Sequence, residues 1–518
     1  MPPRAPIPVI DLFAGPGGLG EGFSALKHPD GTPSFKIALS IEMEEHAFET
    51  LQLRSFFRQD LSPCELSAYY ERIRSRSASN DDLRTEFADT WMKVEAETLR
   101  AKLGEEEDAT PLTHIDARIR KALQGRKNWV LIGGPPCQAY SLVGRVRNLG
   151  IAGYDPGDDP KHFLYRAYLR IIAKHKPSVF VMENVKGILS SRVAGQRIFD
   201  TILRDLSVPA GPSGPRYSLM SATKGFVQSD LTGAPAGDPA DFVVKCEAYG
   251  VPQRRHRVFV IGIREDLVRP LGLLERSPHP VPAGKIIADL PPLRAGVSKS
   301  KLKVEECIRQ IPTTSWMAEI VQKAPAVGSL IHEVVNSFRG IREMNGRGGE
   351  FVRPKTQRVF RGPEHLSEWL LDPHLNGICN HATRAHIPSD LHRYMFAACF
   401  ALVEDGRSPK LQDFPNALLP NHRNRDSGKF VDRFRVQDGK SPATTVTSHI
   451  SKDGHYYIHP DPAQCRSLTV REAARLQTFP DNYFFCGPRT SQYVQVGNAV
   501  PPYIAYQLAR GLLRAFVA

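Results

Sequence analysis

The first apolar run of the chain leads directly into a glycine-rich turn, and this combination restricts the fold more than any other stretch. Residues 8–13 read PVIDLF, a strand pattern, and are followed by Gly15, Gly17 and Gly20 and by a helical segment from Phe23. Glycines let a ligand approach the backbone closely, and the start of a helix offers unpaired N–H groups. The spacing G-x-G-x-x-G predicts a nucleotide-binding βαβ unit and therefore an α/β fold.

Two acidic residues beside this turn bear on which nucleotide it binds. Glu42 stands at the end of a second predicted strand, 36–41, where a carboxylate can accept hydrogen bonds from ribose hydroxyls. Asp11 comes just before the glycines, and a carboxylate there suits a cationic ligand such as S-adenosylmethionine better than a pyrophosphate. The turn by itself leaves a dinucleotide-dependent oxidoreductase open as the alternative.

A second strand-and-turn stretch carries a cysteine. Residues 130–141 read VLIGGPPCQAYS, in which a buried strand is stopped by the Gly-Pro run. Cys137 therefore lies on a loop at the carboxyl end of a strand, the edge of an open α/β sheet at which ligands bind. A reactive nucleophile and a small buried side chain are the two interpretations of this cysteine.

A carboxyl group follows the next predicted strand. A helix is predicted over 162–174 and a strand over 178–182, which ends in Glu183. Because the carboxyl ends of parallel strands share one edge, Glu183 and Cys137 can meet on one substrate. A solvated surface glutamate fits the pattern as well.

Arginines gather in several later stretches. Arg255 and Arg257 lead into a strand predicted over 258–263, and strand alternation places both on one face. Residues 142–159, rich in Gly, Arg and Asp, are predicted to form a mobile lid with Arg145 and Arg147 placed to meet phosphates. Basic clusters near 345–361 and at 421–435 suit groove and phosphate contacts, or form plain surface. The first of these contains Arg347, Arg353, Lys355 and Arg358.

Length and charge limit the kind of protein further. The 518 residues allow two domains, and 68 Lys and Arg against 55 Asp and Glu give a charge of +13, which favours a polyanionic partner. The eight cysteines show no C-x-x-C pair, so we expect free thiols in a reducing compartment and no metal. The longest apolar run, Tyr394–Val403, is too short for a membrane span and predicts a buried helix.

Three other segments are less specific. Residues 61–112 have helical spacing and dense mixed charge, and predict an insertion of helices outside the sheet. Asp116 lies 21 residues before Cys137, where it is placed either to contact an adenine ring or to be an ordinary surface aspartate. Near the end, a capped helix is predicted over 468–477 and a terminal helix from Tyr503.

Six blocks occur in a fixed order along the chain: DLFAGPGG (11–18), GGPPCQAYS (133–141), ENV (183–185), QRRHRV (253–258), LTVREAARLQTFPD (468–481) and QVGNAVPP (495–502). In their residues and in their order these blocks resemble the motifs of the DNA (cytosine-5)-methyltransferases of bacterial restriction–modification or phage-defence type. The resemblance implies a Rossmann-like S-adenosylmethionine-dependent methyltransferase domain with a second, smaller target-recognition domain. The former would comprise residues 1–270 and 464–518, and the latter residues 271–463.

The resemblance also implies roles for individual residues. Cys137 would be the nucleophile, Glu183 the partner of the target ring, and Arg257, with Arg255 behind it, an anchor for the base. The S-adenosylmethionine pocket would be lined by Asp11, Phe13, Ala14, Gly15, Gly17, Gly18, Glu42, Met43, Asp116, Pro136 and Asn498. Candidate DNA contacts are Gln138, Ser141, Arg145, Arg147, Arg347, Arg353, Lys355 and Arg358.

The activity implied is transfer of a methyl group from S-adenosylmethionine to carbon 5 of cytosine, with S-adenosylhomocysteine as product. The substrate would be a specific double-stranded DNA sequence, with a covalent cysteine adduct on a flipped base. We expect a cytoplasmic, nucleoid-associated monomer without a membrane segment, acting alone or with a cognate restriction endonuclease or defence subunits. An RNA cytosine-5 methyltransferase and a catalytically inactive DNA-binding protein are the alternatives.

Overall fold

The computed structural model describes residues 5–75, 79–104, 107–136, 164–193, 196–227, 237–267, 271–337, 346–355, 357–420 and 432–516. Its centre is a nine-stranded sheet in the order β3-β2-β1-β4-β5-β12-β8-β9, with β10 paired to β12. The strands are β1 (Ile7–Leu12), β2 (Phe35–Glu42), β3 (Thr98–Arg100), β4 (Val130–Gly133), β5 (Val179–Val185), β8 (Tyr217–Ser221), β9 (Gly225–Phe226), β10 (Val243–Lys245) and β12 (His256–Arg264).

The first five strands of the sheet are parallel, whereas β12 runs antiparallel to β5 and β8. The strands predicted at 8–13, 36–41, 130–132, 178–182 and 258–263 are thus confirmed, with end points that differ by a few residues. The carboxyl ends of β1, β4 and β5 share one edge, as the α/β prediction required. The sheet therefore brings the glycine turn, the start of the Cys137 loop and Glu183 to the same side.

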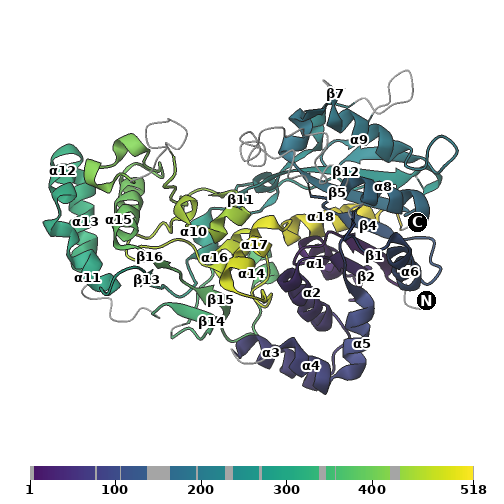
Figure 1. Cartoon of the computed structure of the whole chain (residues 1–518), viewed down its shortest axis with the longest axis horizontal. Coiled ribbons are helices and arrows are strands. Elements are labelled where there is room, and N and C mark those ends of the chain that lie inside the picture. The colour runs from purple at the N-terminus through teal and green to yellow at the C-terminus, as the bar shows by residue number, and fades with distance from the viewer. Residues whose placement is uncertain are drawn as a thin grey trace.

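Alternate residues of the central strands bury on opposite faces of this sheet, which explains the continuous apolar runs. Ile10 and Leu131 join a core with helices α6 (Leu112–Leu123), α8 (Leu164–His175) and α9 (Ile198–Ser207). Val9 and Val130 join a second core with α1 (Gly18–Ala25) and α18 (Pro502–Leu513). The last helix of the chain therefore covers one face of a sheet built from its first half (Figure 1).

Residues after 280 form a second lobe and its connection to the sheet (Figure 1). In the lobe, helices α11 (Val304–Arg309), α12 (Ser315–Lys323), α13 (Pro325–Ser337) and α15 (Pro388–Val403) share one apolar cluster. The helix predicted at Tyr394–Val403 is confirmed as part of α15, and it is buried as far as Ala401, whereas Leu402 and Val403 are exposed. Among the helices in the described ranges, none has the length and apolar character to cross a bilayer.

Short elements lie between the lobe and the sheet. They are α10 (Ala283–Ile287), β13 (Gly296–Val297), β14 (Gly348–Val352), α14 (Glu364–Leu370), β15 (Ile378–Ala382), β16 (Ala385–His386), β11 (Gln253–Arg254) and β17 (Ala443–Thr444). The chain then returns through α16 (Val470–Leu476) and α17 (Arg489–Asn498) to α18. Thr469 and Glu472 cap α16 reciprocally, so the capped helix predicted over 468–477 is confirmed.

The segment predicted as a helical insertion differs from the expectation at its end. Helices α3 (Pro63–Arg74), α4 (Asn80–Glu86) and α5 (Ala88–Glu97) follow α2 (Glu45–Phe57), but β3 then joins the central sheet beside β2. Thr98 and Leu99 are buried by this pairing. A strand of three residues is too short to show a periodic pattern, which is why the sequence did not reveal it.

We predict that Gly22→Ala destabilises the protein. A Cβ at this position of α1 would lie 2.4 Å from the Pro502 carbonyl oxygen and 2.4 Å from the Tyr506 nitrogen of α18. Overpacking of this kind costs about 1–3 kcal/mol, to be measured by urea unfolding. Gly439→Ala is the control, because its Cβ would have no neighbour closer than 3.8 Å. Equal unfolding midpoints for the two variants would contradict the packing argument.

Candidate active site

The turn between β1 and α1 leaves one open position. Phe13, Gly15 and Gly17 all have positive φ angles, of 55°, 57° and 97°. The Gly15 amide donates to a Glu42 carboxylate oxygen at 2.8 Å, which fixes the turn against the end of β2. A Cβ at Gly15 would have no atom within 4 Å, so the backbone here is accessible to a ligand.

The other glycines of this turn serve packing. A Cβ at Gly18 would lie 2.3 Å from the Val500 carbonyl oxygen, and one at Gly17 would lie 2.8 Å from the Leu51 side chain. Gly18 therefore allows the return from α17 to α18 to pass directly beside the turn, and Gly17 allows α2 to pack against it. Asn498, at the end of α17, is exposed there, as is Met43 after β2, with 56% of its surface accessible. Pro136, after β4, is half-buried.

Asp11 is an unusual buried group. It is fully buried in β1, and neither carboxyl oxygen has a hydrogen-bond partner in the part of the chain that the structure describes. Burial raises the pKa of Asp11 to about 8, against the opposing effects of the Arg58 guanidinium and of the nearby Gly20 backbone amide. A buried carboxylate without a partner is costly unless it is protonated or a cation lies near it. The position thus suits a positively charged ligand at this edge of the sheet.

Asp116 has a different environment from the adenine contact that its spacing suggested. Its carboxylate, 1% exposed, accepts hydrogen bonds from Lys174 at 2.5 Å and Arg170 at 3.1 Å, and pairs with His175 at 2.8 Å. Burial acts to raise the pKa of Asp116, but these partners outweigh it and lower the pKa to about 2. The residue ties α6 to α8, a role that spacing along the chain could not reveal.

Glu183 and Arg257 form the polar centre of the edge. Arg257 Nε lies 2.8 Å from Glu183 Oε1, and each side chain is 12% exposed. A Cβ at Gly134 would lie 2.8 Å from Glu183 Oε2, so the loop that leaves β4 runs directly against this carboxyl group. Burial raises the pKa of Glu183, although Arg257 and Arg255 act to lower it. The carboxyl is therefore easier to protonate than that of an exposed glutamate.

Several predicted site residues lie outside the described residues. They are Cys137, Gln138, Ser141, Arg145 and Arg147, together with the expected lid at 142–159. Pro136 is described, and the Asn184 side-chain amide donates to the Pro135 carbonyl at 3.4 Å. Gly134, whose backbone lies against the Glu183 carboxyl, is only three residues before Cys137 in the sequence.

Arg255 lies behind Arg257 and is fully buried. It donates to the carbonyls of Val446 at 2.7 Å, Gly497 at 3.2 Å and Asn498 at 3.4 Å. Burial, helped by Arg257, lowers the pKa of Arg255 to about 9. Gln253 also links this region to the C-terminal return, because its side-chain amide donates a hydrogen bond to the Gln477 side-chain oxygen at 2.6 Å. Sequence analysis did not single out these amides, although both lie within recognised blocks.

The candidate DNA contacts divide into two groups. Arg347, Arg353 and Lys355, around β14, are exposed. Arg358 instead pairs with Asp289 at 2.6 Å and Asp481 at 3.2 Å. Because Arg475 also binds both of these carboxylates, Arg358 belongs to a network that joins the middle of the chain to α16. The guanidinium of Arg358 is thus occupied by partners within the chain.

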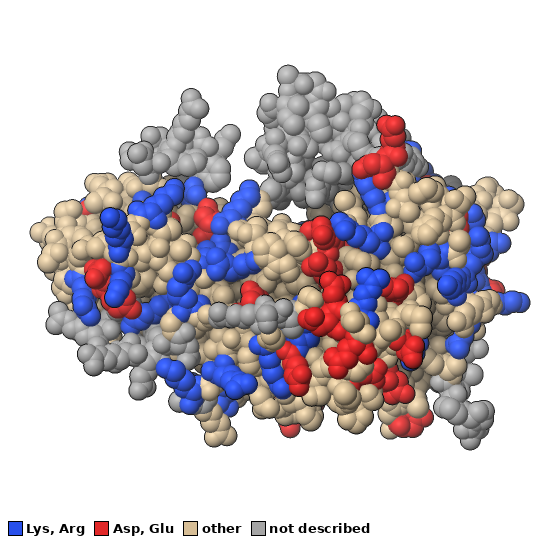
Figure 2. Space-filling model, turned by 60° about the horizontal axis from the view of Figure 1, so that its bottom comes forward, with Lys and Arg blue, Asp and Glu red and all other residues tan. Residues whose placement is uncertain are grey.

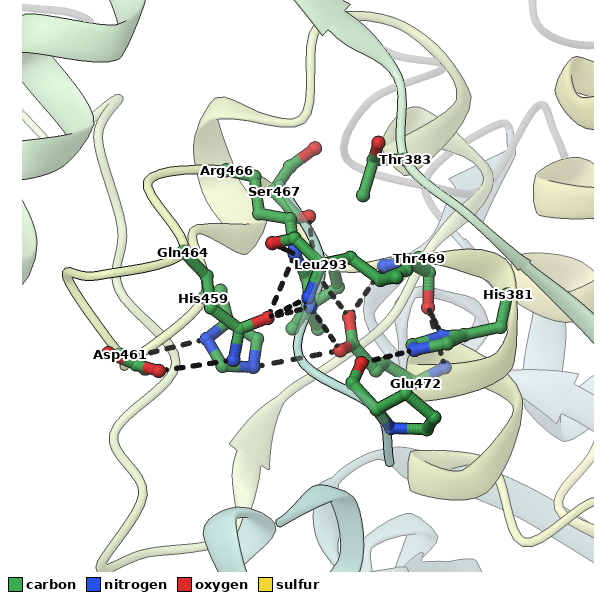
Figure 3. A network of polar contacts seen from close by, with 12 residues as sticks. Leu293, His381, Thr383, His459, Asp461, Gln464, Arg466, Ser467, Thr469 and Glu472 are labelled. Atoms are coloured by element: carbon green, nitrogen blue, oxygen red, sulfur yellow. Dashed lines mark hydrogen bonds and ion pairs between the residues drawn. The ribbon is translucent and has the colours of Figure 1, made fainter. Parts of the chain in front are cut away.

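A second buried network supports α16 from the other side (Figure 3). Glu472 accepts two hydrogen bonds from Arg466, at 2.7 and 2.6 Å. His381 of β15 pairs with the Thr469 hydroxyl and the Pro291 carbonyl, both at 2.9 Å. Burial lowers the pKa of His381 to about 4, so the ring is neutral and acts as a structural link. Within the described ranges, no group of three His, Cys, Asp or Glu side chains is placed to hold a metal ion.

Comparison with known proteins identifies the family of this chain. The family model described as C-5 cytosine-specific DNA methylase matches residues 64–208 and 241–514. The chain belongs to this family. The type II methyltransferase M.Bpa9945I of Bacillus paralicheniformis is 34% identical to this methylase over 97% of the chain and 98% of the relative. The DNA (cytosine-5-)-methyltransferase M.ApeKI of Aeropyrum pernix is 26% identical over 97% of each chain.

A solved structure supports the fold. The methylase superposes with a TM-score of 0.51 and 19% identity on a crystal structure described as a DNA modification methyltransferase encoded within an E. coli prophage, over 98% of this chain and 99% of that one. The Rossmann-like fold and the enzyme class, a DNA (cytosine-5-)-methyltransferase, are confirmed.

We predict that Asp11 makes the stability of this methylase depend on pH. With a pKa near 8 in the fold against an ordinary value of 3.8, the folded protein holds a proton that the unfolded chain releases between these values. Stability must therefore fall as pH rises from 5 to 8. Relative to Asp11→Asn, the wild type should lose at least about 1 kcal/mol over this range, measured by urea unfolding without methyl donor.

The exposed Asp60→Asn is the control, because it removes one carboxylate from the surface and leaves the buried one in place. Parallel pH profiles for the wild type and Asp11→Asn would show that Asp11 is ionised in the fold.

Proposed function

We propose that this enzyme transfers the methyl group of S-adenosylmethionine to carbon 5 of a cytosine extruded from a specific double-stranded DNA sequence. The observation that carries this proposal is the Glu183–Arg257 pair at the carboxyl edge of the sheet, in contact with the loop that leads to Cys137. An acid, a cation and a nucleophile at one edge are the groups that methylation of this unreactive carbon requires.

The residues at the glycine turn fit S-adenosylmethionine. The open backbone at Gly15 accommodates a closely bound ligand, and Glu42 stands where it can accept hydrogen bonds from ribose hydroxyls. The unpartnered carboxyl of Asp11 favours a sulfonium cation nearby, and exposed Met43 offers an apolar surface for the adenine ring. When bound, S-adenosylmethionine supplies an electrophilic methyl group.

Cys137 acts as the nucleophile in this proposal. Carbon 5 of cytosine does not accept a methyl group directly, because it is a poor nucleophile. Addition of the Cys137 thiolate to carbon 6 converts the ring to an enamine, whose carbon 5 can then take up the methyl group. Loss of the carbon 5 proton and release of the thiolate restore the aromatic ring and leave 5-methylcytosine. Because both faces of the ring are needed, the base leaves the helix stack.

Glu183 stabilises the adduct through ring N3. Its raised pKa lets the carboxyl keep a proton that it can share with this nitrogen while negative charge develops on the ring. Arg257, 2.8 Å from the same carboxyl, holds its orientation and adds positive potential that favours thiolate over thiol. Arg255 is anchored to the C-terminal return through the Val446 and Gly497 carbonyls, and its charge adds to the positive potential of Arg257 at Glu183.

The charge distribution indicates which side of the molecule meets DNA. Figure 2 brings forward the side that carries α3, α4 and α5, where acidic side chains gather. Residues 61–112 contain twelve acidic and seven basic residues within a chain of net charge +13. A polyanion is repelled from this side, which leaves the lobe and the catalytic edge for DNA.

The relatives suggest a biological setting. Those at full-length coverage include type II methyltransferases, the modification enzymes of restriction–modification systems. We therefore assign this enzyme the same task, the methylation of a short DNA sequence that a cognate endonuclease would otherwise cleave.

We predict that Cys137→Ala abolishes methylation and leaves DNA affinity largely unchanged, because only the covalent step is lost. Glu183→Gln should lower kcat by about 100-fold or more, since general-acid contributions are of that size. Bisulfite sequencing of a plasmid from expressing cells measures the first effect, and methyl transfer in vitro the second. Cys64→Ala is the control, as Cys64 is an exposed free thiol on α3. Residual methylation in Cys137→Ala would remove the assignment of the nucleophile.

We predict that residues 271–463 determine the methylated sequence. Replacing 271–440 by the segment of a relative should shift the target, read out by whole-genome mapping of 5-methylcytosine. The exchange must keep Asp289 and Arg358, because they bind Asp481 and Arg475 outside it. A control chimera that also replaces these two should lose stability. An unchanged methylation pattern in the active chimera would place recognition elsewhere.

A further inference from the structure

The helical insertion reaches beyond the central sheet to the middle of the chain. Tyr69, Tyr70 and Ile73 of α3 share an apolar cluster with Leu375 and Cys379, which belong to the segment around β15. Packing against α2 and α5 alone would account for a surface insertion, but it does not explain this second contact.

Two polar side chains of α3 fasten this contact. The Tyr70 hydroxyl donates to Asp372 Oδ2 at 2.5 Å, and the same oxygen accepts from the Asn482 amide at 2.5 Å. Arg74 donates to the Leu375 carbonyl at 3.1 Å and also to the His374 carbonyl. Its guanidinium lies over the Tyr70 ring, 5.3 Å from the centroid. Main-chain carbonyls and a shared carboxylate fix the path of residues 372–375 relative to α3.

These residues lead into β15, which pairs with β14 across a long connection that contains α14. This strand pair is the β14–β15 hairpin. β15 pairs antiparallel with β14, so that Cys379 stands opposite Phe351. The exposed Arg347 and Arg353 lie at the two ends of β14. On its other side the hairpin is held by Asn380, whose side chain exchanges two hydrogen bonds with the Phe485 backbone, at 3.1 and 2.9 Å. The hairpin is therefore tied both to the C-terminal return and to the insertion.

We propose that α3 is a positioning element for DNA, which holds the β14–β15 hairpin and its arginines at a fixed place relative to the catalytic edge. The inference rests on the proposed function, since it assumes that Arg347 and Arg353 meet DNA. Tyr70 and Arg74 are positioning residues that act through the hairpin. The insertion is thus part of the machinery that aligns the substrate, although its own surface is acidic.

The test uses the full chain with Tyr70→Phe and Arg74→Ala combined. Hydrogen exchange should be at least about tenfold faster for the amides of 371–382 and unchanged in β1, β4 and β5. The KM for DNA should rise about fivefold, while the KM for the methyl donor and kcat at saturating DNA stay within about twofold. Arg84→Ala is the matched control, because it also removes one arginine from the insertion but only breaks an exposed pair with Glu95.

Several outcomes would overturn the proposal. Unchanged exchange at 371–382 would show that α3 does not hold the hairpin. Faster exchange with an unchanged KM for DNA would show that the hairpin does not align DNA. An equal rise in the KM for the methyl donor would indicate general damage to the catalytic domain.

Two further arms keep the test decisive. If the combined variant does not fold, Tyr70→Phe alone must show the same changes in a smaller degree. If the wild type does not methylate DNA at all, the proposed function fails, and the exchange measurement still reports on the tie between α3 and the hairpin.

Discussion

The buried guanidinium of Arg255 is the interaction on which the site depends. Its removal from water is costly, and the carbonyls of Val446, Gly497 and Asn498 replace part of the lost hydration. These carbonyls belong to residues that lie between 191 and 243 positions after Arg255 in the sequence. Because a cation in this position is tolerated only when both segments, at Val446 and at Gly497 with Asn498, are in place, Arg255 makes the edge of the sheet depend on the C-terminal return. The same charge adds to the field that acts on Glu183.

At the carboxyl edge of the sheet, burial and ion pairing have opposite effects on the charges of the site residues. Burial favours the neutral forms of both Glu183 and Arg255, whereas the pairing of Glu183 with Arg257 favours charge. The result is a carboxyl group with a raised pKa that lies within ion-pair distance of a guanidinium. A surface pair of the same residues would not have this property, because water would screen it. The packing of the return against β12 therefore sets the chemistry as well as the fold.

Sequence analysis predicted the central strands, the glycine turn and the convergence of Glu183 with the Cys137 loop, since each depends on local pattern and on the shared edge of parallel strands. It could not predict which partner a charged side chain would choose. Asp116 pairs with Lys174, and Arg358 pairs with Asp289, in each case a partner distant in the sequence. The role of Gly18 and Gly22 was also hidden, because it depends on the distant α18. Strand β3 was not predicted because three residues are too few to show an alternation of buried and exposed side chains.

Among the residues that the structure describes, the interior of the second lobe has few polar links to the residues at the edge of the sheet. Around the second lobe, the buried networks of Arg475 with Asp289 and of Glu472 with Arg466 hold the segments that enter and leave it. Through Arg358 and His381 they also hold the short elements between the lobe and the sheet. The helices between them pack on a cluster of their own, separate from the two cores of the sheet. Substitutions inside that cluster can alter the lobe without disturbing Arg255 or Glu183. This separation supports the proposal that target recognition lies in the lobe, where the sequence can vary without affecting the groups at the edge of the sheet.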